Sequence, residues 1–72
     1  MKSIHTVEHK KIAKLCRKTR LELNLSQQKV AKDLGISQSY LSKIESGQVR
    51  FDISIISTLA KYYKQPVSYF IK

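Results

Sequence analysis

The sequence is poor in the residues that build many kinds of functional site. Its 72 residues include one cysteine, two glycines, two histidines, no tryptophan and five acidic residues. Lone Cys16 excludes an internal disulfide and fits a reducing compartment. Its place beside Leu15 on an apolar helix face favours a buried, inert thiol. Two glycines leave no glycine-rich phosphate loop, and no paired carboxylates or Ser-His-Asp set appear, so we expect no enzyme.

A metal site is also excluded by the spacing of its possible ligands. His5, His9 and Cys16 fall on one helical face. His9 and Cys16 lie about 10 Å apart along a helix, whereas zinc needs its ligands within about 2.3 Å. Two histidines alone are too few ligands, so we expect neither a metal nor another cofactor.

Long apolar runs are missing as well. No run approaches the roughly 20 residues of a membrane-spanning helix, and the N-terminus lacks the apolar stretch of a signal peptide. Positive charge is what the chain has in excess, since 14 Lys and Arg residues give a formal net charge of +9. A polyanion is therefore the natural partner. We expect one soluble, cytoplasmic domain over residues 1–72, with a flexible N-terminus over residues 1–6 and no membrane partner.

Residues 27–46 have the pattern of two short helices joined by a tight turn. Gly35 stands where the first helix must end in the left-handed conformation, which glycine adopts without penalty. Ser37 can cap the second helix through its hydroxyl. Both helices have an apolar edge, formed by Val30, Ala31, Leu34, Ile36, Leu41 and Ile44. The joint pattern predicts a helix-turn-helix, with helices over residues 27–34 and 38–46.

Three further helices are predicted around this corner. The first covers residues 7–23, is capped by Thr6, and has a buried stripe at helical spacing: Ile12, Leu15, Cys16, Thr19 and Leu23. The fourth follows a cap at Asp52 and runs to residue 63, with Ile53 among its inward residues. A short fifth helix covers residues 67–71 after Pro66. The predicted fold is all-α, a compact five-helix domain.

The chain resembles the phage-repressor and Cro-like (Xre-type) helix-turn-helix family beyond this corner. The likeness covers roughly residues 10–71 and includes the segments Asn24-Leu25-Ser26-Gln27 and Ile44-Glu45-Ser46-Gly47. It implies a lambda-repressor-like DNA-binding domain that usually works as a dimer. The chain departs from the family pattern at four positions: Asn24, Gln48, Lys64 and Pro66.

The resemblance also implies which residues meet double-stranded DNA. The first turn of the second helix of the motif enters the major groove, and glutamine there suits bidentate pairing with adenine. The expected base contacts are Gln38, Ser39 and Lys43, with Ser37, Tyr40 and Ser42 nearby. The expected phosphate contacts are Arg20, Gln27, Lys29, Gln48 and Arg50. The alternative is that the Ser/Gln-rich helix start is only capping and solvent-facing polarity. The basic residues of the first helix are interpreted as remote, solvated charges.

Two structural contacts follow from the same resemblance. Arg20 and Glu45 are expected to pair across the first and third helices. Losing one partner would cost about 3–5 kcal/mol if the pair is buried and about 0–1 kcal/mol if it is exposed. The crowded apolar C-terminus is expected to form a dimer seam, although packing onto the fourth helix is the alternative; its residues are Val67, Tyr69, Phe70 and Ile71.

The sequence thus favours a sequence-specific transcriptional regulator, a dimeric repressor that binds a palindromic operator in the nucleoid. The alternative is an antitoxin that neutralises a partner toxin and represses its own promoter. A membrane-active basic peptide is disfavoured because the charges do not lie opposite one broad apolar face.

Overall fold

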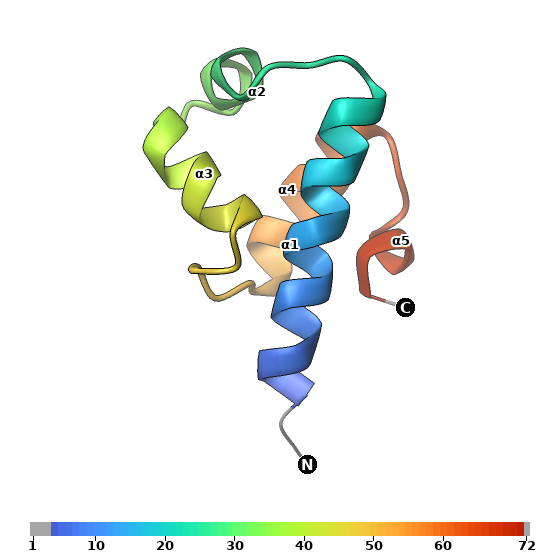
Figure 1. Cartoon of the computed structure of the whole chain (residues 1–72). Helices are drawn as coiled ribbons and strands as arrows, with labels where there is room; N and C mark the ends of the chain where they lie inside the picture. The colour runs from blue at the N-terminus through green and yellow to red at the C-terminus, as the bar shows by residue number, and fades with distance from the viewer. Residues whose placement is uncertain (1–3, 72) are drawn as a thin grey trace.

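The computed structural model describes residues 4–71, with side chains from His9 onward. It contains five helices: α1 (Ile4–Glu22), α2 (Gln27–Leu34), α3 (Gln38–Glu45), α4 (Ile53–Tyr63) and α5 (Val67–Ile71). Within residues 4–71 there is no strand. Long α1 contacts α3, α4 and α5, and α2 packs against α3 to form a corner at one side of the bundle (Figure 1). The all-α prediction with α2 and α3 as the helix-turn-helix is therefore confirmed.

The bounds of α1 differ from the prediction. The helix begins at Ile4, three residues before the expected start, so Thr6 lies inside it and is not its cap. It ends at Glu22, one residue early, and Asn24 takes the left-handed conformation with φ 58°. Asparagine tolerates this conformation better than most residues. Residues 1–3, part of the N-terminus expected to be flexible, lie outside the described residues.

Helices α2, α3 and α4 start at side-chain caps. The hydroxyl of Ser26 accepts a hydrogen bond from the backbone N–H of Lys29, and the carboxylate of Asp52 accepts one from that of Ile55. Such caps satisfy backbone donors that have no partner within the helix, and each stabilises by about 0.5–2 kcal/mol. α3 ends at Glu45, one residue before the expected end, because Ser46 already has the φ of −97° and ψ of 0° of its cap.

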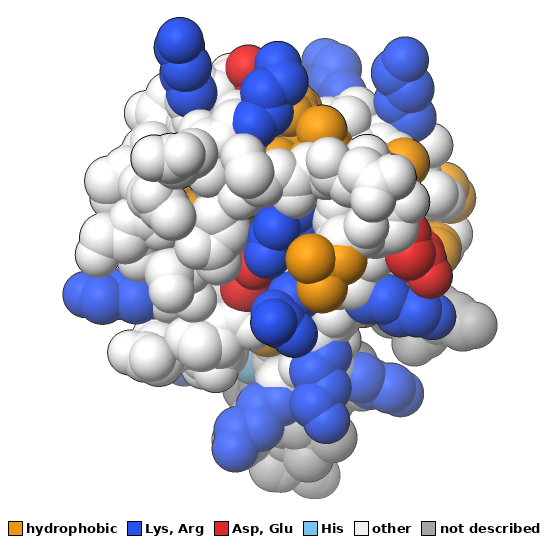
Figure 2. Space-filling view, turned by 45° about the horizontal axis from the view of Figure 1, so that its top comes forward, with side chains coloured by type: hydrophobic (Ala, Val, Ile, Leu, Met, Phe, Trp, Pro, Cys, Tyr) orange, Lys and Arg blue, Asp and Glu red, His pale blue; other side chains and the backbone are white. Residues whose placement is uncertain are grey.

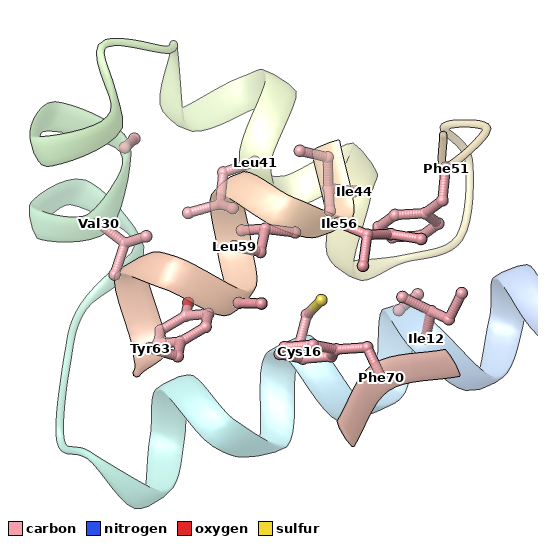
Figure 3. Packing of buried hydrophobic residues seen from close by; sticks show 13 residues of the cluster. Ile12, Cys16, Val30, Leu41, Ile44, Phe51, Ile56, Leu59, Tyr63 and Phe70 are labelled. Carbon is pink, nitrogen blue, oxygen red and sulfur yellow. The ribbon is translucent and has the colours of Figure 1, made fainter. Parts of the chain in front are cut away.

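The core lies where α1, α3 and α4 meet (Figure 3). Its buried residues are Ile12, Ala13, Cys16, Val30, Ala31, Leu41, Ile44, Phe51, Ile56, Leu59, Ala60, Tyr63 and Phe70. Leu23, expected in this core, is 51% exposed because α1 has already ended and no longer turns it inward. Ile53, also expected to face inward, is 63% exposed at the start of α4. Phe51, from the loop before it, is buried in the core instead.

Cys16 is buried, as predicted. Burial raises the pKa of its thiol to about 12, and the negative charge of Glu45 adds to the effect. The thiol is therefore protonated at neutral pH, which is the inert form. None of the helices in the described part of the chain is both long and apolar enough to span a membrane.

Candidate nucleic-acid interface

α3 has two edges of opposite character, which we call its inner and outer edges. The inner edge consists of Leu41, Ile44 and Glu45, all buried against the rest of the domain. The outer edge consists of Gln38, Ser39, Ser42 and Lys43, all exposed. Because the inner edge is fixed in the core, the outer edge is held in one orientation toward solvent.

A buried ion pair fixes the end of α3 to α1. The Arg20 Nε donates to Glu45 Oε2 at 2.7 Å, and Nη2 donates to Oε1 at 3.0 Å. The Nη1 of Arg20 donates to the Leu25 carbonyl at 2.8 Å. The two side chains are only 8% and 2% exposed. The hydrogen bonds to Glu45 raise the pKa of the guanidinium, which stays charged. Arg20 was expected to contact a phosphate too, but most of its donors are already engaged inside the domain.

The ion pair continues as a chain of polar contacts to the start of α3. Gln27, the first residue of α2, donates from Nε2 to Glu45 Oε1 at 3.0 Å. Its Oε1 accepts a long hydrogen bond, of 3.5 Å, from Nε2 of Gln38. Gln27, expected to contact a phosphate, and Gln38, expected to read a base, therefore lie side by side. The chain of contacts limits the conformations that the exposed Gln38 amide can take.

Ser37 and Tyr40, two of the six residues expected to contact bases, are placed differently from the other four. The hydroxyl of Ser37 accepts from the backbone N–H of Tyr40 at 3.0 Å, so it caps α3. The Tyr40 ring, 39% exposed, lines a hollow of about 240 Å³ between α3 and α4, away from the outer edge. The other residues lining this hollow are Leu34, Ile36, Ile44, Ser54, Ile55, Thr58 and Leu59. Of the six expected base contacts, Gln38, Ser39, Ser42 and Lys43 are the ones that share an outward edge.

The other expected phosphate contacts, Lys29 on α2 and Gln48 and Arg50 after α3, are exposed. Lys29 lies 3.2 Å from Asp33 in an exposed ion pair on α2. Gln48 donates to the Ser46 hydroxyl at 2.9 Å, and Arg50 is exposed in the loop that follows α3. That loop and α1 border a second hollow, of about 370 Å³ and open to solvent, which Lys10 also lines. Lys10 was not among the predicted contacts, because the charges of α1 were interpreted as remote.

The basic side chains gather around a largely uncharged surface. Figure 2 shows Lys and Arg along the part of α1 near the N-terminus, beside a broad area without charged groups. Within residues 9–71 the ion pairs are Lys18–Glu22, Arg20–Glu45 and Lys29–Asp33. The remaining cations of these residues are available to an external polyanion.

The residues expected at a dimer seam are divided between the core and the surface. Phe70 is 5% exposed and packs into the core of its own chain, which leaves its ring little area to offer a second copy. Tyr69 is partly buried, and its hydroxyl lies 3.1 Å from that of Thr19 on α1. Val67 is partly buried, and Ile71 is 42% exposed.

The described residues contain no group of three His, Cys, Asp or Glu side chains able to hold a metal ion. The side chain of His5 lies outside the described residues. His9 packs edge-on against Phe51, with ring centroids 5.7 Å apart.

Comparison with known proteins agrees with this geometry. Residues 17–70 match the family model described as helix-turn-helix. No curated protein sequence matches the chain. The chain is similar in structure to the clp gene regulator ClgR from C. glutamicum, with a TM-score of 0.81 and 16% identity over 88% of this chain and 82% of that one. It is also similar to the restriction-modification controller protein C.AhdI from Aeromonas hydrophila. That match has a TM-score of 0.79 and 25% identity over 89% of this chain and 97% of that one.

Proposed function

The chain belongs to the helix-turn-helix family of DNA-binding transcription regulators, and from this premise we propose that it is a dimeric repressor. It is not an enzyme. In the proposed complex the outer edge of α3 lies in the major groove of a palindromic operator. Gln38 and Ser39 read bases, and Lys43 contacts a base or the adjoining backbone. The protein acts on the nucleoid in the cytoplasm.

The observation that carries the proposal is the contact chain from the Arg20–Glu45 pair through Gln27 to Gln38. Gln38 is exposed, yet its neighbour Gln27 is held by the buried Glu45 carboxylate. A glutamine amide offers a donor and an acceptor side by side, which match N7 and N6 of adenine. A side chain that is oriented in advance loses less entropy when it binds. This arrangement favours the proposal that Gln38 reads a base over the alternative that it is only a solvent-facing polar residue.

A dimer is proposed because one copy of α3 reads only a few bases. Two copies about 34 Å apart would meet successive major grooves on one side of the duplex. The exposed Ile71, together with the accessible parts of Val67 and Tyr69, is the proposed centre of the seam. Repression would follow from occupancy, since a protein bound over a promoter excludes others from the same DNA. The restriction-modification controller protein, at 25% identity, is a regulator by its description, which supports this class of function.

The test starts with selection of a preferred site from random duplexes. We expect a palindromic consensus. Gln38→Ala should then weaken binding to the selected duplex by about 1–3 kcal/mol, with a much smaller effect on unrelated duplexes. Binding isotherms on both kinds of duplex would measure the change in the specificity ratio.

Two variants serve as references for that measurement. Gln65→Ala removes the same side chain from the α4–α5 turn and should leave both affinities unchanged. Lys29→Ala should weaken binding to all duplexes alike, because a phosphate contact has no sequence preference. A specificity ratio that Gln38→Ala leaves at the wild-type value would refute the assignment of the outer edge as the reader.

A further inference from the structure

We propose that α1 supplies a second DNA-backbone site, formed by the hollow between α1 and the loop over residues 47–50. Its occupant would be a phosphate of the duplex that flanks the bases read by α3, held by Lys10 and Arg50. The proposal rests on the proposed function and extends the contact surface to a helix outside the helix-turn-helix. The hollow is lined by His9, Lys10, Gly47, Gln48, Val49 and Arg50.

The hollow is shaped by the close approach of Lys10 to Gly47. A Cβ built on Gly47 would lie 3.6 Å from Cγ of Lys10 and 3.9 Å from the Lys10 Cα, which is ordinary contact distance. The aliphatic stem of Lys10 therefore lies along the loop backbone, with no side chain of Gly47 between them. Gly47 has φ 82°, a conformation that other residues rarely adopt, so the loop holds this shape with glycine in place.

Lys10 belongs to a stripe of α1 that faces α3 and the loop. Residues 10, 13, 17 and 20 are spaced by three, four and three, which places them on one face of a helix. The buried members, Ala13 and Arg20, contact the position of Gly47 and the carboxylate of Glu45. The exposed members are Lys10 and Arg17, so both cations border the elements proposed to meet DNA. Lys11, one residue further along the helix, points about 100° away.

Charge also favours an anion in this hollow. Within residues 9–71 every carboxylate is engaged: Glu22 and Asp33 pair with lysines, Glu45 pairs with Arg20, and Asp52 caps α4. Lys10 and Arg50 take part in none of these pairs. An ammonium and a guanidinium that line one hollow match a phosphodiester, whose charge is spread over two oxygens.

Lys10 lies outside the part of the chain that the family model matches. The match to the family model begins at residue 17, and Lys10 lies seven residues before it. The N-terminal half of α1 extends past the end of α3 (Figure 1). A phosphate bound there would lie beyond the recognised bases, on the side of the loop over residues 47–50.

The experiment measures how salt affects binding to a fluorescein-labelled duplex of about 20 base pairs, two helical turns. Each phosphate neutralised adds about −0.9 to the slope of log K against log salt concentration. We expect the Lys10→Gln/Arg50→Gln double variant to have a slope smaller in magnitude by about 1.8, because each copy of the proposed dimer loses one phosphate contact. The ratio of wild-type to variant affinity should then fall about 12-fold between roughly 50 mM and 200 mM KCl. Lys11→Gln, which removes the same charge from the neighbouring face, should keep the wild-type slope.

A double-mutant cycle tests whether the two cations share one phosphate. The effects of Lys10→Gln and Arg50→Gln should be less than additive, whereas Lys10→Gln and Lys29→Gln should add. Thermal melts check that these surface variants remain folded. If Lys10→Gln and Lys11→Gln bind identically at every salt concentration, the hollow is not a phosphate site, although the proposed function stands. If the wild type binds no duplex at low salt, the proposed function itself fails.

Discussion

Two helix pairs, α2–α3 and α4–α5, are joined by turns of the same kind but have different roles in the domain. Gly35 after α2 and Lys64 after α4 both adopt the left-handed conformation, with φ 72° and 58°. At each corner this residue donates its backbone N–H to a carbonyl three residues back at 3.2 Å, and the next residue donates to a carbonyl five residues back at 2.9 Å. The hydrogen bonds are equivalent, but glycine occupies only the first corner.

The pairs differ in how their second helix is held. α3 is fixed by the closed polar network around Glu45, which leaves its outer edge free for contacts with other molecules. α5 is fixed by the buried ring of Phe70. On α4, the buried hydroxyl of Tyr63 has no hydrogen-bond partner in the described part of the chain. The turn therefore sets the path of the chain. The side chains that fix the second helix of each pair decide whether that helix keeps an exposed edge, as α3 does, or covers the core, as α5 does.

The largest effect is expected from removing the negative charge of Glu45, which holds α3 to α1. Glu45→Gln strands the buried Arg20 guanidinium, and we expect it to lower the free energy of unfolding by about 3–5 kcal/mol. Chemical denaturation would measure the loss. Glu22→Gln breaks the exposed pair with Lys18 and should cost at most about 1 kcal/mol. Equal losses in the two variants would mean that the buried network is not what holds α3.

The equivalence of the two corners is tested by one substitution at each left-handed residue. Gly35→Ala should lower the free energy of unfolding by about 1–2 kcal/mol, because alanine is strained at positive φ. No atom lies within 4 Å of the new Cβ, so the cost is conformational and not a clash. Lys64→Gly should raise the free energy of unfolding, by about 1 kcal/mol or less, since the strain relieved exceeds the added flexibility of the unfolded chain.

Denaturation curves of both variants would decide this point. If Lys64→Gly destabilises the protein, the lysine side chain contributes more than its backbone strain costs, and the two corners are not equivalent.

The smallest expected effect concerns the contact that joins the two pairs. The Tyr62 hydroxyl on α4 donates to the Asp33 carboxylate on α2 at 2.6 Å. This hydrogen bond, assisted by Lys29, lowers the pKa of Asp33 below its ordinary value of 3.8. It also raises the pKa of Tyr62 to about 12 from its ordinary value of 10.0. The stabilisation is therefore complete above pH 3.8, is lost as the pH falls through the folded pKa of Asp33, and is also lost as the pH rises from 10 toward 12.

Tyr62→Phe should remove part of this dependence at both ends of the pH range. The melting temperature, measured as the pH falls below 3.8 and again between pH 10 and 12, would show this change. Tyr40→Phe removes a phenol hydroxyl from the α3 surface and should leave the pH dependence of the melting temperature below pH 3.8 unchanged. If the melting temperature of Tyr62→Phe falls with pH below 3.8 as steeply as that of the wild type, then Lys29 alone sets the pKa of Asp33.

The sequence was informative wherever local chemistry decides the structure. Gly35, Ser37 and Asp52 have strong conformational or capping preferences, and the end of α2 and the starts of α3 and α4 follow from them as predicted. The pairing of Arg20 with Glu45 came from the family resemblance, since nothing local to α1 or α3 specifies a contact between residues 25 positions apart.

The errors arose where the structure depends on how far an element extends. Helical spacing gives the face on which a residue lies, but it does not say where the core ends. Leu23 and Ile53 have the right spacing and are exposed, since one follows the end of α1 and the other begins α4. Lys10 was missed for the same reason, because its importance depends on the loop over residues 47–50 lying against α1.

The inner and outer edges of α3 have no residue in common, and this separation bears on how such a protein changes over time. Substitutions at Gln38 or Ser39 leave the groups that anchor the helix untouched. New side chains can therefore be tried there, by natural variation or in a displayed library, without first repairing the fold. Under the proposed function, the domain is a scaffold whose target can be reassigned by a few exchanges.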